Sequence, residues 1–114
     1  MITVSITRQS AADSRIVSFA IEGHAKFANP GKDIVCAGVS AVSVGTVNAI
    51  EALAGVELPA SMKSGWLRSE IPAGEHTADS DAKTQLLLES MIVMLDSIAA
   101  SYGKYVVIRQ LFRE

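Results

Sequence analysis

The order of two hydrophobic periods along the chain constrains its fold more than any other feature. Apolar residues at every second position indicate a strand, and apolar residues three or four positions apart indicate a helix. Strand patterns occupy residues 2–7, 17–21, 56–64, 66–72 and 105–112, and helical patterns occupy residues 34–54 and 84–101. The predicted order is therefore β-β-α-β-β-α-β. Paired strands separated by two helices predict an α+β fold, in which a single mixed or antiparallel sheet packs with both helices.

Capping residues predict where the first helix begins and ends. Asp33 is a good N-cap and Gly55 a good C-cap. Between them apolar residues occur on nearly every face, which is typical of a buried helix. The second helix is expected to follow a polar connection at residues 73–80 and to end at Gly103.

Length and composition limit the class of protein. The chain has 114 residues, which is the size of one domain, here taken as residues 1–114. Apolar residues make up 49% and charged residues only 19%, so we expect some apolar surface to be buried in a homodimer. The net charge is −2 and no basic run is present, which argues against direct binding of nucleic acid.

Cysteine content and the N-terminal pattern indicate a cytoplasmic protein. There is one cysteine, so an internal disulfide is not possible and the thiol is expected to be reduced. The chain opens with strand alternation rather than with a signal segment. Ser, Gly and Asn interrupt the longest apolar stretches, from which we expect no membrane span.

The single cysteine lies at a chemically favourable position. If Asp33 caps the helix, Cys36 falls in its first turn, beside free N–H groups and the positive end of the helix dipole. That position favours the thiolate, which is the nucleophilic form of cysteine. The same N–H groups could hold the oxyanion that forms when a carbonyl is attacked.

A proton acceptor for the thiol could be His24, which precedes Cys36 by 12 residues across a loop that contains a turn. Imidazole exchanges protons near neutral pH, and a Cys–His pair can rest as thiolate and imidazolium. Asp33 could orient His24, cap the helix, or do both. His76, in a polar loop, is a rival base for Cys36.

Structural explanations compete with the catalytic one. A lone cysteine near the start of a buried helix is usually a small core hydrophobe, and Asp33 could be a cap alone. His24, Cys36 and His76 provide too few ligands, at no recognised spacing, for a metal site. The sequence therefore predicts no metal and no cofactor.

Two motifs carry a family resemblance. They are Gly23-His24-Ala25 and Gly31-Lys32-Asp33-Ile34-Val35-Cys36-Ala37-Gly38-Val39-Ser40. Together they resemble the ribosomal-processing cysteine protease family (Prp). The resemblance extends over the whole chain as pattern, because length, element order and the position of the motif near the first helix all agree.

The resemblance implies a role for each residue of the motifs. The catalytic histidine of the family falls on His24, the nucleophile on Cys36 and an assisting acid on Asp33. The segment between them, which begins at Ala25 and ends at Lys32, corresponds to a mobile loop that orders over the substrate. The candidate substrate-binding residues are this loop together with Gly23, which could be its hinge, Ala37, Gly38 and Ser40.

The resemblance also implies an activity. Members look like homodimeric endopeptidases that remove the N-terminal extension of a large-subunit ribosomal protein during ribosome assembly. Cleavage after paired aromatic residues would require an apolar cleft. The alternative is a non-catalytic, ribosome-associated assembly factor in which Cys36 is structural. A thiol redox sensor is a weaker option, because the chain has no second cysteine to resolve an oxidised thiol.

Overall fold

The computed structural model describes residues 1–113 and contains the predicted elements in the predicted order. They are β1 (Ile2–Arg8), β2 (Ile16–Glu22), α1 (Ile34–Ala49), a π-helical turn η1 (Ile50–Ala54), β3 (Ser61–Lys63), β4 (Trp66–Glu70), α2 (Ala78–Ser101) and β5 (Val106–Phe112). The α+β prediction is confirmed.

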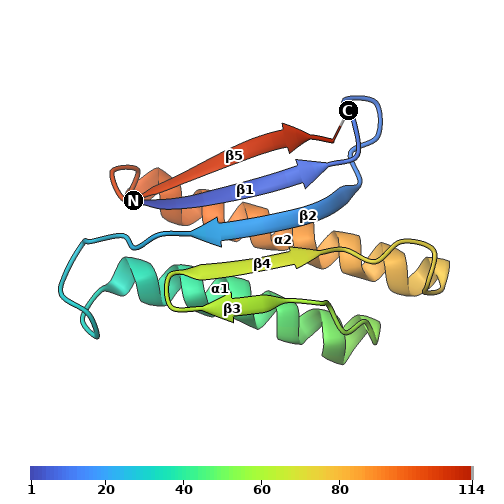
Figure 1. Ribbon diagram of the computed structural model, residues 1–114, viewed down its shortest axis with the longest axis horizontal. Helices are drawn as coiled ribbons and strands as arrows, with labels where there is room; N and C mark the ends of the chain where they lie inside the picture. Colours follow the sequence, from blue (N-terminus) through green and yellow to red (C-terminus); the bar gives the residue numbers. More distant parts are fainter. Residues whose placement is uncertain (114) are drawn as a thin grey trace.

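The five strands form one mixed sheet in the order β3-β4-β2-β1-β5 (Figure 1). The first two strands form an antiparallel hairpin, and β4 pairs antiparallel with both β2 and β3. Only β5 runs parallel to its neighbour β1, after α2 has crossed the sheet. The sequence left open whether the sheet is mixed or antiparallel, and the pairing of β5 decides it.

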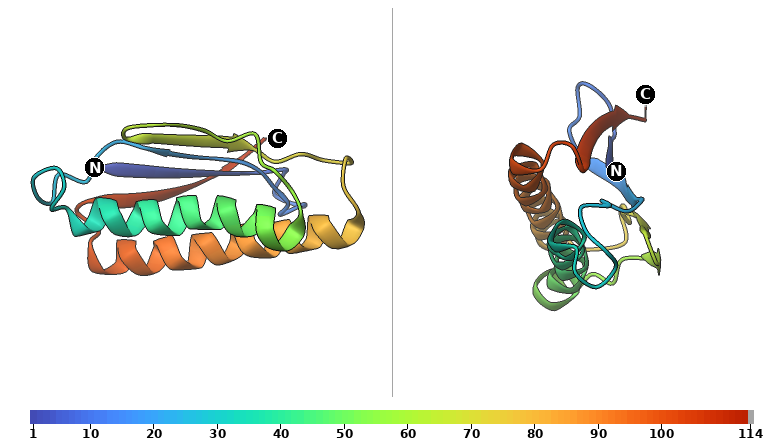
Figure 2. Two further views of the ribbon diagram at one scale, coloured as in Figure 1. Left: turned by 90° about the horizontal axis from the view of Figure 1, so that it is seen from below. Right: turned by 90° about the vertical axis from the view of Figure 1, so that its left-hand side faces the viewer.

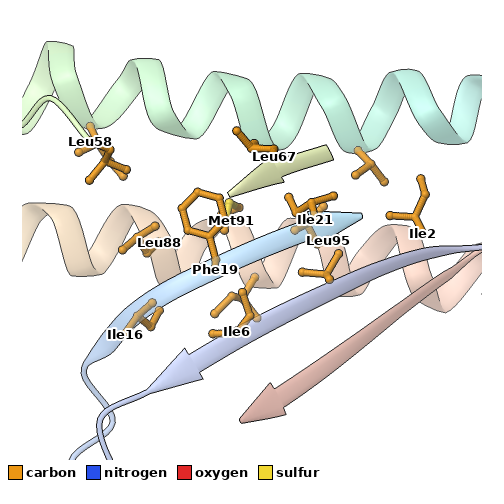
Figure 3. Close-up of a cluster of buried hydrophobic side chains, with 14 of the residues drawn as sticks. Ile2, Ile6, Ile16, Phe19, Ile21, Leu58, Leu67, Leu88, Met91 and Leu95 are labelled. Carbon is orange, nitrogen blue, oxygen red and sulfur yellow. The ribbon is translucent and has the colours of Figure 1, made fainter. Parts of the chain in front are cut away.

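Both helices cover the same face of the sheet, which gives two layers (Figure 2). The core lies between these layers, as Figure 3 shows. Alternate residues of the first strand point into it, and Val4 and Ile6 are fully buried. From the helical layer, Leu88, Met91 and Leu95 of α2 are equally buried at helical spacing.

The second helix begins earlier than predicted. It starts at Ala78, and the hydroxyl of Thr77 caps it by accepting a hydrogen bond from the N–H of Ser80 at 3.1 Å. The prediction of a polar connection at residues 73–80 was therefore wrong for residues 78–80, which form the first turn of the helix. The first turn carries Asp79 and Asp81, which suit a helix N-terminus but give no apolar period. The helix ends at Ser101, ahead of Gly103.

The third strand is much shorter than predicted, at three residues. Residues 56–60 alternate like a strand because Val56 and Leu58 are buried in the core. They do not pair with the sheet, and Pro59 has no N–H to donate. The prediction of a strand from 56 to 64 was wrong for its first five residues, because alternate burial does not require a hydrogen-bonded neighbour.

The first helix begins after Asp33 as predicted, and Gly55, at φ 70°, ends its π-helical extension. The prediction that it is buried all round was wrong. One side packs on the sheet, whereas Ile34 and Leu53 are 59% and 65% exposed. The apolar residues on its outer side therefore form molecular surface, which the sequence pattern could not distinguish from core.

Both helices meet the length and hydropathy requirements for a membrane span, contrary to the expectation drawn from their polar interruptions. A core helix of a soluble protein satisfies the same requirements, and each of these helices packs one side against the sheet. The observation is therefore weak evidence for a membrane.

Candidate functional site

The start of α1 is built around the carboxylate of Asp33. Its Oδ1 atom accepts hydrogen bonds from the N–H groups of Val35 and Cys36, both at 3.0 Å, and its carbonyl accepts the N–H of Ala37 at 3.0 Å. Asp33 is thus the predicted N-cap. These three N–H groups already have acceptors, so they are not free to hold an oxyanion while the cap is formed.

The second oxygen of the same carboxylate holds the loop that precedes the helix. Oδ2 accepts the N–H groups of Phe27 at 2.9 Å and Ala28 at 3.2 Å. Asp33 therefore joins the loop at residues 25–32 to the first turn of α1. The structure gives Asp33 these backbone partners, and no hydrogen bond from the His24 side chain to Asp33 occurs within residues 1–113.

The ionisation of Asp33 reflects this environment. Burial disfavours the charged carboxylate, but the hydrogen bonds donated by four backbone N–H groups outweigh it. The donors, in order of their effect, belong to Cys36, Ala28, Phe27 and Val35. The pKa of Asp33 therefore lies below its ordinary value.

The sulfur of Cys36 lies against the loop that carries His24. The N–H of Ala25, the residue after His24, donates to Sγ at 3.3 Å, and Ala25 itself is buried. This contact joins the start of α1 to the residue that follows His24. The cysteine is half-buried rather than enclosed in the core, so a substrate can reach it.

Two clefts open on this cysteine. The first, here called the loop cleft, has a volume of about 760 Å³ and lies between the loop at 25–32 and the start of α1. The second, the hairpin cleft, has a volume of about 300 Å³ and lies between α1 and the β3–β4 hairpin. Four residues line both clefts: His24, Cys36, Ser40 and Ser64. The two clefts therefore meet at the cysteine and the histidine.

The other candidate residues from the motifs are distributed around these clefts. Ala37 lines the loop cleft, as do five loop residues: Lys26, Ala28, Pro30, Gly31 and Lys32. Gly23 lines the hairpin cleft. Gly38 lines neither, because it faces α2, where an added Cβ would lie 3.5 Å from the side chain of Ile98.

Gly23 occupies a tightly packed position. Its φ is 97°, and a Cβ added there would lie 2.3 Å from the carbonyl oxygen of Met1. Its N–H donates to the carbonyl of Gly65 at 2.8 Å. Only glycine fits this conformation and this close approach. The backbone before His24 is thus fixed on both sides.

His76 does not reach the site in this structure. It belongs to the exposed connection before α2, which lies at the end of the molecule opposite to the start of α1 (Figure 1). It lines neither cleft. Of the two histidines, only His24 lies beside the cysteine. Within residues 1–113, no group of three or more His, Cys, Asp or Glu side chains could hold a metal.

Sequence reasoning missed the far wall of the hairpin cleft, which comes from the β3–β4 hairpin. Its residues are Met62, Lys63, Ser64, Gly65 and Trp66. The turn itself could be predicted from the Ser64-Gly65 pair. Its place beside Cys36 depends on the pairing of β4 with β2, in which Trp66 faces Glu22. No local signal in the sequence reports that pairing.

Comparison with known proteins agrees with this geometry. Residues 1–107 match the family model described as cysteine protease Prp. The chain is 44% identical over 103 residues to the ribosomal processing cysteine protease Prp of Bacillus subtilis (strain 168), an alignment that covers 87% of this chain and 89% of that protein.

Solved structures match over nearly the full length. The essential ribosomal processing protease Prp of S. aureus with a covalently linked product peptide superposes with a TM-score of 0.83 and 30% identity, covering 96% of this chain and 99% of that one. The S. aureus protease with a substrate peptide superposes with a TM-score of 0.76 and 29% identity, at the same coverage.

Proposed function

The chain belongs to the family of cysteine protease Prp, and on this premise we propose that it is an endopeptidase that processes a ribosomal protein. We further infer that it removes the N-terminal extension of a large-subunit ribosomal protein, with Cys36 as nucleophile and His24 as base. The observation that carries this proposal is the convergence of both clefts on these two side chains.

The first half of the proposed reaction is an acyl transfer to sulfur. The Cys36 thiolate attacks the scissile carbonyl, and the His24 imidazolium protonates the departing amine, which leaves a thioester. The clefts on either side of the sulfur would hold the two halves of the peptide. The apolar groups of the loop cleft, such as Ala28, Pro30 and Ile34, suit apolar substrate side chains.

The second half is hydrolysis of the thioester. Neutral His24 removes a proton from water, the water oxygen attacks the carbonyl, and the sulfur leaves as thiolate. The N-terminal extension, which was the acyl part of the thioester, is then released with a new carboxylate; the shortened ribosomal protein has already left as the amine of the first step.

The oxyanion requires donors other than the first N–H groups of α1, since Asp33 already occupies those. The hydroxyl groups of Ser40 and Ser64 are suitable, because both residues line both clefts. Ser40 lies one helical turn after Cys36 and therefore on the same side of α1. We propose these hydroxyls as oxyanion donors.

Asp33 acts in this proposal as a positioning residue. Its carboxylate is negative and bonded to the N–H of Cys36, so its charge opposes the thiolate. What Asp33 contributes is the fixed placement of the loop against the helix.

The test of the proposed function is mass spectrometry of the precursor ribosomal protein from the same organism after incubation with this protein. We expect a single cleavage that removes the N-terminal extension. An intact precursor, together with stable association of this protein with ribosomal particles, would instead support the non-catalytic assembly factor. A shortened variant of the precursor that lacks the extension serves as the control and should remain unchanged.

We also propose a homodimer whose contact lies on the outer side of the helices. A shallow groove there is lined by Ala41, Val42, Gly45, Thr46, Ala49, Leu87, Ser90 and Met94. Leu86 and Val93 are also exposed on α2, at 69% and 65%. The groove lining carries no charge, so two copies would meet there without repulsion, and its small residues allow close approach.

The dimer can be tested at Gly45, where an added Cβ would meet nothing within 4 Å. We expect the wild type to sediment as a dimer at micromolar concentration and Gly45→Glu as a folded monomer, because the glutamate would bury a charge in the contact. Gly45→Ala is the matched control and should remain dimeric. A monomeric wild type would contradict the proposal.

The remaining expectations complete the proposed function. We propose that residues 1–114 act as one protease domain in the cytoplasm, without metal, cofactor, membrane or direct nucleic-acid contact. The net charge of −2 supports recognition of the ribosomal protein as a peptide rather than of RNA.

A further inference from the structure

The imidazole of His24 packs directly on Gly65, in the turn between β3 and β4. A Cβ added at Gly65 would lie 2.5 Å from Nε2, 2.8 Å from Cε1 and 3.2 Å from Cδ2 of that ring. Real side-chain atoms do not approach so closely, so the ring occupies the space that a side chain at position 65 would need. Of the eight glycines in the chain, only Gly65 has a histidine ring in this space.

The backbone around this contact is fixed from both strands. Gly23, immediately before His24, donates its N–H to the carbonyl of Gly65 at 2.8 Å. The next pair along the ladder joins Glu22 of β2 to Trp66 of β4. The turn and the histidine are therefore held in one register, and the ring cannot move toward the hairpin beyond the Gly65 backbone.

We propose that Gly65 is a positioning residue that sets the orientation of the His24 imidazole toward Cys36. This rests on the proposed function, in which His24 exchanges protons with Cys36 and the leaving amine. A side chain at position 65 would push the ring away from its place between the two clefts. A displaced base loses proton transfer in the chemical step, so the loss is expected in kcat rather than in KM.

The test compares Gly65→Ala with Gly74→Ala. Both glycines have positive φ, 73° and 76°, so alanine meets similar backbone strain at each. They differ in contact, because nothing lies within 4 Å of a Cβ at Gly74. We expect kcat of Gly65→Ala to fall by about 10²-fold with KM nearly unchanged, and kcat of Gly74→Ala to equal that of the wild type. Equal activity of both variants would overturn the proposal.

Two further measurements do not require activity. The imidazole NMR signals of His24 should shift in Gly65→Ala, while those of His76 stay fixed as an internal reference. In a stability cycle, Gly65→Ala should lower the melting temperature more in the wild type than in His24→Ala, where the ring is absent. The single variant Gly65→Ala could fail to fold. In that case, folding of the double variant His24→Ala/Gly65→Ala supports the contact, and failure of the double variant to fold overturns it.

These readouts separate the two proposals. If the cycle and the NMR shift agree with the contact but the wild type cleaves no precursor, the proposed function fails while the contact stands. If the wild type cleaves the precursor but the cycle shows no coupling between positions 24 and 65, the positioning role fails alone.

Discussion

Replacing Cys36 by alanine is expected to abolish cleavage of the precursor ribosomal protein. Removing the nucleophile of a covalent mechanism typically costs about 10⁴-fold or more in kcat. The fold should survive, because the cysteine is only half-buried. The substitution removes only one hydrogen bond, that from the Ala25 N–H to Sγ, which is worth about 1 kcal/mol. The measurement is single-turnover cleavage together with a thermal melt of the variant.

His24→Ala is the companion variant. General base catalysis contributes about 10²- to 10⁴-fold, so a smaller but still large loss is expected. His24 is exposed and its ring is outside the core, so the melting temperature of His24→Ala should stay close to that of the wild type. His76→Ala, at the other end of the molecule, is the matched control and should retain full activity.

Chemical modification provides an independent check on the same thiol. The chain has one cysteine, so a single adduct of iodoacetamide identifies the modified residue. We expect activity to fall in proportion to the fraction labelled. Full cleavage by Cys36→Ala, or by the fully labelled protein, would eliminate the assignment of the nucleophile.

Asp33 is the second position where a large effect is expected, and two substitutions can separate its two roles. Asparagine is as good an N-cap as aspartate, so Asp33→Asn should keep the bonds to Val35 and Cys36. Its amide nitrogen cannot accept, so the bonds to the loop at residues 25–32 are lost. Alanine removes both sets.

We therefore expect a graded loss of activity. Asp33→Asn should lower kcat/KM by about 10-fold through a looser loop, and Asp33→Ala by about 10²-fold, because the start of α1 and the Cys36 backbone also lose their support. Steady-state cleavage of the same precursor peptide measures both. If both variants lose activity equally, the hydrogen bonds to the loop alone account for the role of Asp33. If both keep wild-type activity, Asp33 has no positioning role in catalysis.

The lowered pKa of Asp33 also predicts a dependence of stability on pH. A carboxyl whose pKa is lower in the folded state contributes stability above its unfolded pKa of about 3.9, and loses it as the pH falls through the folded value. The melting temperature of the wild type should exceed that of Asp33→Asn at neutral pH. The difference should narrow below about pH 4, because Asp33 of the wild type becomes protonated, whereas the other carboxyls titrate in both proteins and their effect cancels. A constant difference across this range would contradict the assignment.

Most of the fold could be predicted from periodicity, and the failures share one cause. Alternation located β1, β2 and β4 because each has one face on the core. It also marked residues 56–60, where Val56 and Leu58 are buried without strand pairing. Periodicity reports burial, so it missed the polar first turn of α2, and it counted the exposed outer side of α1 as core.

The candidate site also has a part that local sequence predicts and a part that only burial and packing decide. The sequence by itself determined the N-cap at Asp33, the place of Cys36 in the first turn and the loop that carries His24, because caps, turns and helix starts depend on neighbours a few residues away. Only the tertiary structure decided which residues face that turn. The Ser64-Gly65 turn reaches His24 because β4 pairs with β2, across more than 40 residues of chain. Register of this kind results from the packing of the whole sheet against the helices, and no local pattern encodes it.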